Sequence, residues 1–142
     1  MNATKTARRK FSTLINSTGQ MIYTQPYNGQ VWSTDSYFAV ADKLDVTSKR
    51  TDVRDTTPDI TRIVECAGEY KTATPVKTDQ KANEWDQVMI YTIGSENVNG
   101  RMVEAFLMLP DVEFKYANDL IYNPIKVYQN NKLIGLIMPL RK

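Results

Sequence analysis

The chain has 142 residues, of which 42% are hydrophobic and 24% charged, as is usual for a globular protein of one domain. It has no histidine and one cysteine, Cys66, which excludes an internal disulfide, the common catalytic triads and most zinc sites. No apolar run reaches the roughly 18 residues that cross a bilayer, and residues 1–11 lack the apolar stretch of a signal peptide. We therefore expect a cytoplasmic protein without membrane contact.

The formal net charge is +2, but the charges are unevenly distributed along the chain. Residues 1–50 carry seven Lys or Arg against three Asp, whereas residues 51–100 carry five against nine acidic residues. The first part of the chain is therefore compatible with an anionic partner.

Residues 4–17 are predicted to form an amphipathic helix, which Gly19 would end. Its apolar face would hold Ala7, Phe11, Leu14 and Ile15. Its polar face would carry the cations Lys5, Arg8 and Arg9, with Lys10 beside them. The next residues are rich in aromatic and β-branched side chains and contain Asn28-Gly29, a strong hairpin signal. They predict strands at 21–25, 30–34 and 37–42.

The middle of the chain gives weaker signals. Residues 45–57 are polar and predict an exposed loop, and Pro58 after a Thr57 cap opens a predicted helix over 58–70. Residues 71–84 predict a second exposed polar loop. The apolar segments 85–94 and 101–109 predict two strands, joined by a hairpin turn over 95–100.

The last third of the chain repeats the pattern of the first. Asp111 is predicted to cap a short helix whose inner face holds Phe114, Ala117, Leu120 and Ile121. Strands at 124–129 and 132–140 would follow, with Asn130-Asn131 as their turn. A helix, a hairpin and an apolar strand thus occur near both ends of the chain. This order predicts an α+β domain, residues 1–142, of two helix-plus-hairpin repeats with a mostly antiparallel sheet.

Two short segments, STDSYFAVAD over residues 33–42 and LIMPLR over residues 136–141, together resemble bacterial DNA sliding clamps, the β subunit of the replicative polymerase. Residues 33–42, STDSYFAVAD, resemble the clamp stretch Thr-Asp-Gly-His-Arg-Leu, with Ser36, Tyr37 and Phe38 in place of its Gly, His and Arg. Residues 136–141, LIMPLR, resemble the clamp ending Val-Met-Pro-Met-Arg-Leu, with Leu140 in place of its second Met. The agreeing residues are Thr34, Asp35, Met138, Pro139 and Arg141.

The resemblance implies a fold and a function. A clamp domain consists of two repeats of a strand, a helix and three strands, and its helices face DNA inside a ring. The two matching stretches line one hydrophobic pocket that receives short peptides from polymerases and repair proteins. A clamp protomer holds three such domains, so this chain would encircle DNA only as an assembly of about six copies. The comparison favours a small clamp-like protein of phage or mobile-element origin.

On this resemblance, the candidate peptide-binding residues come from both segments. They are Thr34, Asp35, Tyr37, Phe38, Leu136, Met138, Pro139, Leu140 and Arg141. The alternative is that the last strand simply fills the core, because alternate residues on both of its faces are apolar. In that case a helix, a loop or another subunit covers the second face.

The candidate DNA-binding residues are Lys5, Arg8, Arg9 and Lys10 of the first helix, which would give a salt-dependent affinity without sequence preference. The alternative is an ordinary solvated helix face. The predicted second helix argues against DNA threading, because Asp111, Glu113 and Asp119 outnumber Lys115 there.

We expect a non-enzymatic accessory module that binds protein peptides and contacts DNA nonspecifically, without a cofactor, a metal or a small-molecule substrate. A structural or oligomerisation protein with no DNA role is the first rival. A hydrolase that uses two carboxylates is the second, although no spacing in the sequence argues for it. Trp32 and Trp85 are interpreted as core or edge aromatics.

Overall fold

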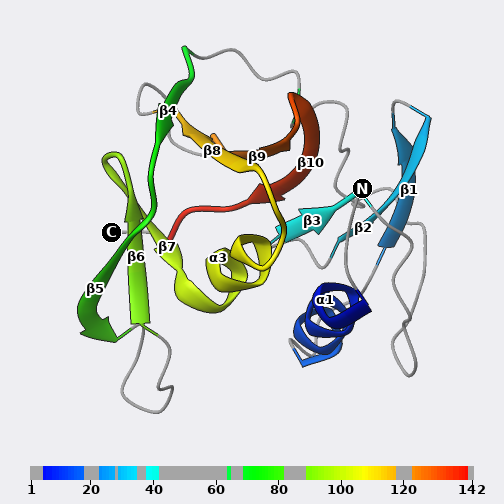
Figure 1. Ribbon diagram of the computed structural model, residues 1–142, viewed down its shortest axis with the longest axis horizontal. Coiled ribbons are helices and arrows are strands. Elements are labelled where there is room, and N and C mark those ends of the chain that lie inside the picture. Colours follow the sequence, from blue (N-terminus) through cyan, green and yellow to red (C-terminus); the bar gives the residue numbers. More distant parts are fainter. Residues whose placement is uncertain are drawn as a thin grey trace.

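The computed structural model describes residues 5–17, 23–27, 29–34, 38–41, 64, 69–81, 89–117 and 123–140. Within them the protein is α+β, with two helices and ten strands whose pairings are all antiparallel (Figure 1). The helices are α1 (Lys5–Ser17) and α3 (Gly100–Leu107). The strands are β1 (Tyr23–Tyr27), β2 (Gln30–Thr34), β3 (Phe38–Val40), β4 (Lys71–Ala73), β5 (Val76–Lys81), β6 (Met89–Ile93), β7 (Glu96–Asn99), β8 (Val112–Tyr116), β9 (Ile125–Gln129) and β10 (Lys132–Ile137).

The larger sheet has seven strands in the order β1-β2-β3-β10-β9-β8-β4. Strands β1 to β3 form one meander and β8 to β10 form another, and the two meanders meet where β3 pairs with β10. Each meander follows a helix in the chain. The described chain therefore contains two units of one helix and three strands, joined through their last strands.

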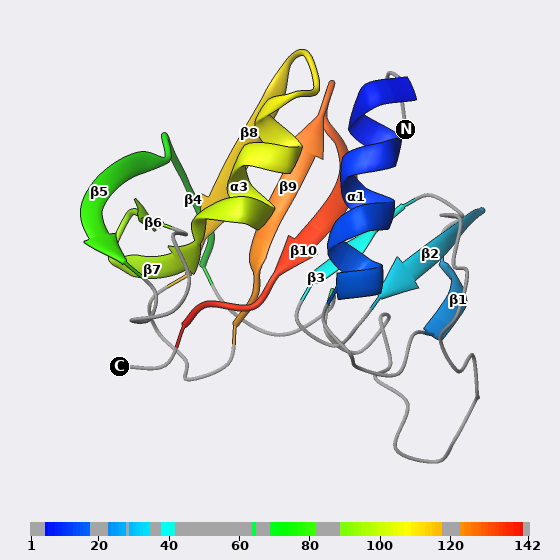
Figure 2. The same cartoon turned by 90° about the horizontal axis from the view of Figure 1, so that it is seen from below.

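Both helices lie on the same face of the larger sheet, side by side (Figure 2). Their contact centres on Phe11 and Phe106, whose ring centroids are 4.8 Å apart at an interplanar angle of 61°. The ring of Phe106 in turn covers Gly135 of β10, where a Cβ atom would overlap it. The absence of a side chain at Gly135 thus lets α3 approach the middle of the sheet closely.

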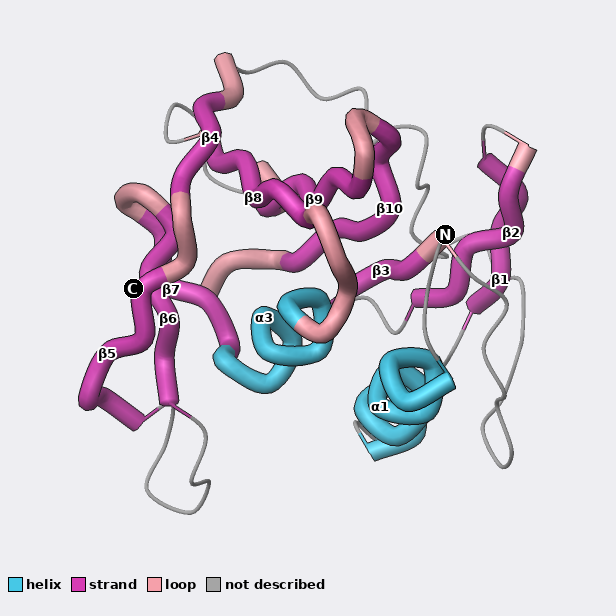
Figure 3. The backbone as a smooth tube through the Cα atoms, in the orientation of Figure 1, coloured by secondary structure: helices cyan, strands magenta, loops and turns pink. Residues whose placement is uncertain are grey.

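The smaller sheet has three strands in the order β5-β6-β7. It is linked to the larger sheet because β5 continues from β4 after Thr74 and Pro75, and because β7 leads directly into α3 (Figure 3). The β6–β7 turn also packs on the larger sheet, since the backbone of Gly94 lies against the ring of Tyr116.

The core lies between the helices and the larger sheet, with a contribution from the smaller sheet. Phe11, Phe106, Phe114 and Ile137 are almost completely buried. Trp32 is also buried, which confirms that it is a core aromatic, while Trp85 lies outside the described residues. Ile134 and Leu136 are buried as well, so both faces of the last strand are covered.

The prediction is confirmed at both ends of the chain. The predicted helix over 4–17 corresponds to α1, with Ala7 and Phe11 buried, and the predicted strands near 21–42 correspond to β1, β2 and β3. The last predicted hairpin corresponds to β9 and β10, and the two asparagines of its turn have positive φ. The α+β class and the mostly antiparallel sheet are also confirmed.

Three predictions in the middle of the chain are wrong. Residues 101–109 were expected to form a strand but lie mainly in α3, and the helix expected after Asp111 is instead strand β8. The polar loop expected over 71–84 contains β4 and β5. The loop expected over 45–57, the helix expected over 58–70 apart from Val64, Glu69 and Tyr70, and the residue Cys66 lie outside the described residues.

Candidate functional site

The outer face of α1 is cationic. Lys5, Arg8 and Arg9 are exposed, and Lys10 at the flank of this face is half-buried. The opposite face of the helix is apolar, with Ala7 and Phe11 buried and Leu14 half-buried. With about 3.6 residues per turn, this spacing separates the apolar and cationic residues onto opposite sides of the helix. The four residues that the sequence predicts for phosphate contact are therefore brought together.

The sheet and α3 fix the orientation of this cationic face. Phe11 points toward the core and packs edge-on against Phe106 of α3. The exposed cations consequently lie on the side of α1 away from the core. The Thr13 hydroxyl donates to the Arg9 carbonyl at 2.9 Å within the same helix.

The second helix differs from the one that the sequence predicted. Within α3, Arg101 is exposed and Glu104 is half-buried, so the helix contributes one cation and one anion. Asp111, Glu113 and Lys115 belong to the turn before β8 and to β8 itself. Asp111 and Glu113 are therefore not on a helix, and Asp119 lies outside the described residues, but α3 is not the basic second helix that the clamp resemblance implies.

Glu104 is held by a tyrosine of the smaller sheet. The Tyr91 hydroxyl donates to Glu104 Oε1 at 3.0 Å. Burial raises the pKa of Tyr91 above its ordinary value, and both the hydrogen bond to Glu104 and the charge of that carboxylate raise it further. This pair ties α3 to β6 and directs the Glu104 carboxylate toward the protein.

The structure does not bring the described peptide-binding candidates together around one opening. Phe38 is paired with Ile137, and the next pair in the register is Ala39 with Leu136. Because neighbouring residues of a strand point to opposite faces, Phe38 and Leu136 lie on opposite sides of the sheet. Both are buried, as is Thr34, whose hydroxyl donates to the Phe38 carbonyl at 2.8 Å.

The end of the chain follows a separate course. Met138, Pro139 and Leu140 are half-buried and leave β10 toward the smaller sheet. The Leu140 amide donates to the Asn97 carbonyl of β7 at 2.8 Å. Asp35, Tyr37 and Arg141 lie outside the described residues. The described part of this segment therefore contacts β7 through its backbone.

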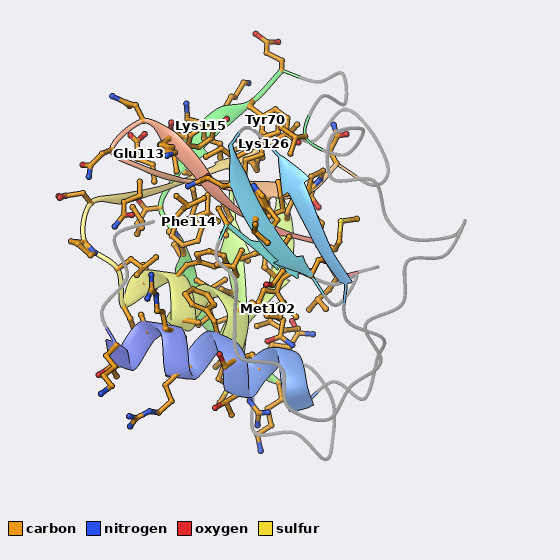
Figure 4. All side chains as sticks on the ribbon, turned by 90° about the vertical axis from the view of Figure 1, so that its right-hand side faces the viewer. Tyr70, Met102, Glu113, Phe114, Lys115 and Lys126 are labelled. Carbon is orange, nitrogen blue, oxygen red and sulfur yellow. The ribbon has the colours of Figure 1, made fainter. Side chains whose placement is uncertain are left out.

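A group of lysines and tyrosines that sequence analysis missed lies on the other face of the larger sheet, away from α1 (Figure 4). Lys115 and Lys126 are directly opposite each other on β8 and β9. Lys126 Nζ lies 4.2 Å from the ring centre of Tyr70 and donates to the Val64 carbonyl at 2.8 Å. Lys115 Nζ lies 4.7 Å from the ring centre of Tyr128. The alternation of Val112, Phe114 and Tyr116 with charged residues was the signal for this strand.

These two lysines have structural partners. Cation–π contacts with different tyrosines stabilise each ammonium group. The Tyr70 hydroxyl also donates to the Pro124 carbonyl at 2.9 Å, so Tyr70 and Val64 are both held against β9 and the residue before it. We therefore assign Lys126 and Tyr70 to the attachment of Val64 and Tyr70 to the larger sheet, and not to ligand binding.

Within the part of the chain that the structure describes, no group of three or more His, Cys, Asp or Glu could hold a metal ion. No helix among the described residues is long and apolar enough to cross a membrane. A comparison with protein-family models, curated proteins and solved structures gives no significant match to this chain. The outer face of α1 and the C-terminal segment are therefore the candidate functional sites among the described residues.

Proposed function

We propose that the protein is a non-enzymatic, clamp-like accessory module that contacts nucleic-acid phosphates through the outer face of α1. The observation that carries this proposal is the exposure of Lys5, Arg8 and Arg9 together on one face of a helix that is anchored through Phe11. Replication of a phage or another mobile element is the process that the resemblance to sliding clamps implies.

The topology supports the clamp-like part of the proposal. The two helix-plus-three-strand units meet at an antiparallel strand pair, and both helices lie on one face of the sheet. A twofold rotation perpendicular to a sheet produces this arrangement, because it reverses strand direction while keeping the helices on the same side. The second unit also has β7 before its helix, giving the order strand, helix and three strands that clamp repeats have.

The number of cations limits how strong the contact is. Three residues that each neutralise one phosphate give a plot of log affinity against log salt with a slope of about −3 on duplex DNA. One copy alone would therefore bind weakly at physiological salt, and retention would depend on assembly or on a partner.

The experiment compares two triple variants of equal charge. One replaces Lys5, Arg8 and Arg9 with Gln, and the control replaces Lys71, Lys77 and Lys81, which are exposed on β4 and β5. Fluorescence anisotropy with a duplex would be measured across a salt series. We expect the α1 variant to lose at least tenfold in affinity and most of the salt slope, while the control retains both.

Two outcomes would contradict the proposal. Equal losses in both variants would mean that overall charge, and not α1, attracts the DNA. A parent protein that does not bind the duplex at low salt would remove the DNA contact altogether.

A second candidate function is peptide capture near the C-terminal segment. The observation that favours it is that Met138, Pro139 and Leu140 keep part of their side-chain surface exposed, and methionine adapts to varied apolar partners. Met138→Ala should weaken binding of a peptide from a sliding-clamp partner. Unchanged affinity would exclude this segment as the site.

The rival proposal is an oligomerisation module without a DNA role. It draws on Leu107 and Met108, adjacent apolar residues at the end of α3 that are 46% and 38% exposed. Size-exclusion chromatography with light scattering distinguishes the clamp-like module from the oligomerisation module. A ring-sized assembly favours the clamp-like module, and a compact dimer favours the oligomerisation module.

A further inference from the structure

Four strands form the edges of the two sheets among the described residues: β1 and β4 in the larger sheet, and β5 and β7 in the smaller one. An edge strand presents N–H and C=O groups that can pair with another chain. Proteins suppress such pairing with prolines, lysines, short strands and irregular pairing. These four edges can be compared by that criterion.

Three of the edges carry such protection. Strand β1 contains Pro26, and β4 is three residues long and begins with Lys71. Strand β5 carries Lys77, Asp79 and Lys81, and its pairing with β6 shifts register between the two lysines. Each of these features interrupts a continuous row of hydrogen-bonding groups or places charge along it.

Strand β7 carries fewer of these features. It has four residues, Glu96–Asn99, with one charged side chain, Glu96, and neither proline nor lysine. The two-residue turn Gly94-Ser95 joins β7 to β6, so Ile93 and Glu96 form the hydrogen-bonded pair that closes the hairpin. Hydrogen-bonded and non-hydrogen-bonded pairs alternate along an antiparallel ladder. The backbone N–H and C=O of the next residue, Asn97, therefore point away from β6. The Asn97 carbonyl accepts from the Leu140 amide at 2.8 Å. The C-terminal segment therefore contacts the edge whose own sequence offers neither proline nor lysine.

We propose that the segment 138–140 is a cover for the β7 edge, and that this edge, once uncovered, pairs with β7 of a second copy of the chain. The segment is partly buried along its whole length, which fits a strand-like cover. The inference does not depend on DNA contact, since α3 lies between β7 and α1 (Figure 1).

The charges of β7 permit this pairing. An antiparallel twofold contact centred on Val98 would place Asn97 of one copy opposite Asn99 of the other, with the Asn99 N–H facing the Asn97 carbonyl. The Asn99 carbonyl belongs to the N-cap of α3 and takes no part in this contact. Glu96 would then lie opposite Gly100, so no like charges would meet. The contact stops at Gly100 because α3 begins there.

The test uses variants that uncover the edge in two ways. One is the chain ending at Pro139, and the other is Leu140→Pro in the full chain, which removes the N–H that donates to Asn97. Leu140→Ala keeps that N–H and is the matched control. Sedimentation velocity across a concentration series would give the self-association constant of each, with circular dichroism as the check on folding.

We expect both uncovered variants to associate at least tenfold more tightly than the parent and Leu140→Ala. Adding Asn97→Lys to the chain that ends at Pro139 should return its association to the parent level, because a lysine on the edge opposes pairing. Association that stays at the parent level in both uncovered variants overturns the proposal. So does association, or precipitation, that Asn97→Lys leaves unchanged, because the contact then lies elsewhere.

Discussion

Helices α1 and α3 occupy matching positions in the two units, yet they are attached in different ways. α1 has 13 residues and is held by an apolar stripe that centres on Phe11. α3 has eight residues and is fixed at specific points: Asn99 caps it, Glu104 bonds to Tyr91, and Phe106 covers Gly135. The described contacts of the shorter helix thus include a cap, a side-chain hydrogen bond to β6 and a close packing contact with β10.

The difference suggests a division of roles. An isolated helix of eight residues is unstable in water, so α3 depends on its tertiary contacts. It in turn provides the surface on which α1 packs. We infer that α3 organises the core, while α1 presents a charged face whose residues are dispensable for folding. Substitutions around α3 should therefore cost far more stability than substitutions on the outer face of α1.

The largest effect is expected for Gly135→Val. The added side chain would overlap the ring of Phe106, and the Ala39 carbonyl lies on the same side at 3.4 Å, so the strand has little room to move. We expect a loss of about 3 kcal/mol in the free energy of unfolding, measured with urea.

Two further variants sharpen that measurement. Adding Phe106→Ala to Gly135→Val should cost less than the sum of the two single changes, because the smaller residue makes room. Thr6→Val on the exposed part of α1 should change stability by less than about 0.5 kcal/mol. Equal losses from Gly135→Val and Thr6→Val would contradict the contrast between the helices.

The ends of the chain could be predicted from the sequence because strong local signals agreed with the tertiary structure there. The hydrophobic period of α1 and the Asn130-Asn131 turn each specify one local conformation. The exposed cationic face followed directly from the same period. The sequence indicated which residues are peptide-binding candidates. It could not predict which of them lie on the same side of the sheet, because that depends on the register between β3 and β10.

The secondary-structure predictions for the middle of the chain were wrong for identifiable reasons. Residues 95–100 were predicted to be a hairpin turn, but they contain strand β7 and the cap residue Asn99, and a cap residue before a helix has the same composition as a turn. The apolar residues of 101–109 fit the spacing of a helix as well as that of a strand, so hydrophobic periodicity alone did not distinguish a helix from a strand there. Strands β4 and β5 are edge strands with mostly exposed polar residues, which leaves almost no hydrophobic signal.

An intermediate effect is expected at the start of α3. The Asn99 side chain accepts from the Arg101 amide at 2.9 Å, and Asn99→Ala would leave that amide without this partner. We expect a loss of about 1 kcal/mol in the free energy of unfolding. Asn99→Asp retains an acceptor beside the positive end of the helix dipole and should cost little. If both variants unfold at the same urea concentration as the parent, the cap does not stabilise α3.

The smallest effect is a pH dependence from the bond between Tyr91 and Glu104. The pKa of Tyr91 is raised in the folded protein, first by burial and then by Glu104, so the folded state holds the phenol proton more tightly than the unfolded state. This contribution is fully present below the pKa of an unfolded tyrosine, about 10, and declines as the pH rises above it. Urea unfolding from about pH 8 to 11 should therefore show a steeper loss for the parent than for Tyr91→Phe, because phenylalanine has no proton to lose.

The parent and Tyr91→Phe contain the same lysines, so the difference between their free energies of unfolding at each pH does not include the titration of those lysines. Glu104→Gln keeps an acceptor but removes the charge, so its slope should fall between the other two. A stability difference between parent and Tyr91→Phe that stays constant over this range would show that α3 is not anchored through a protonated Tyr91. The contrast with α1 would then rest on Asn99 and on the fit of Phe106 over Gly135.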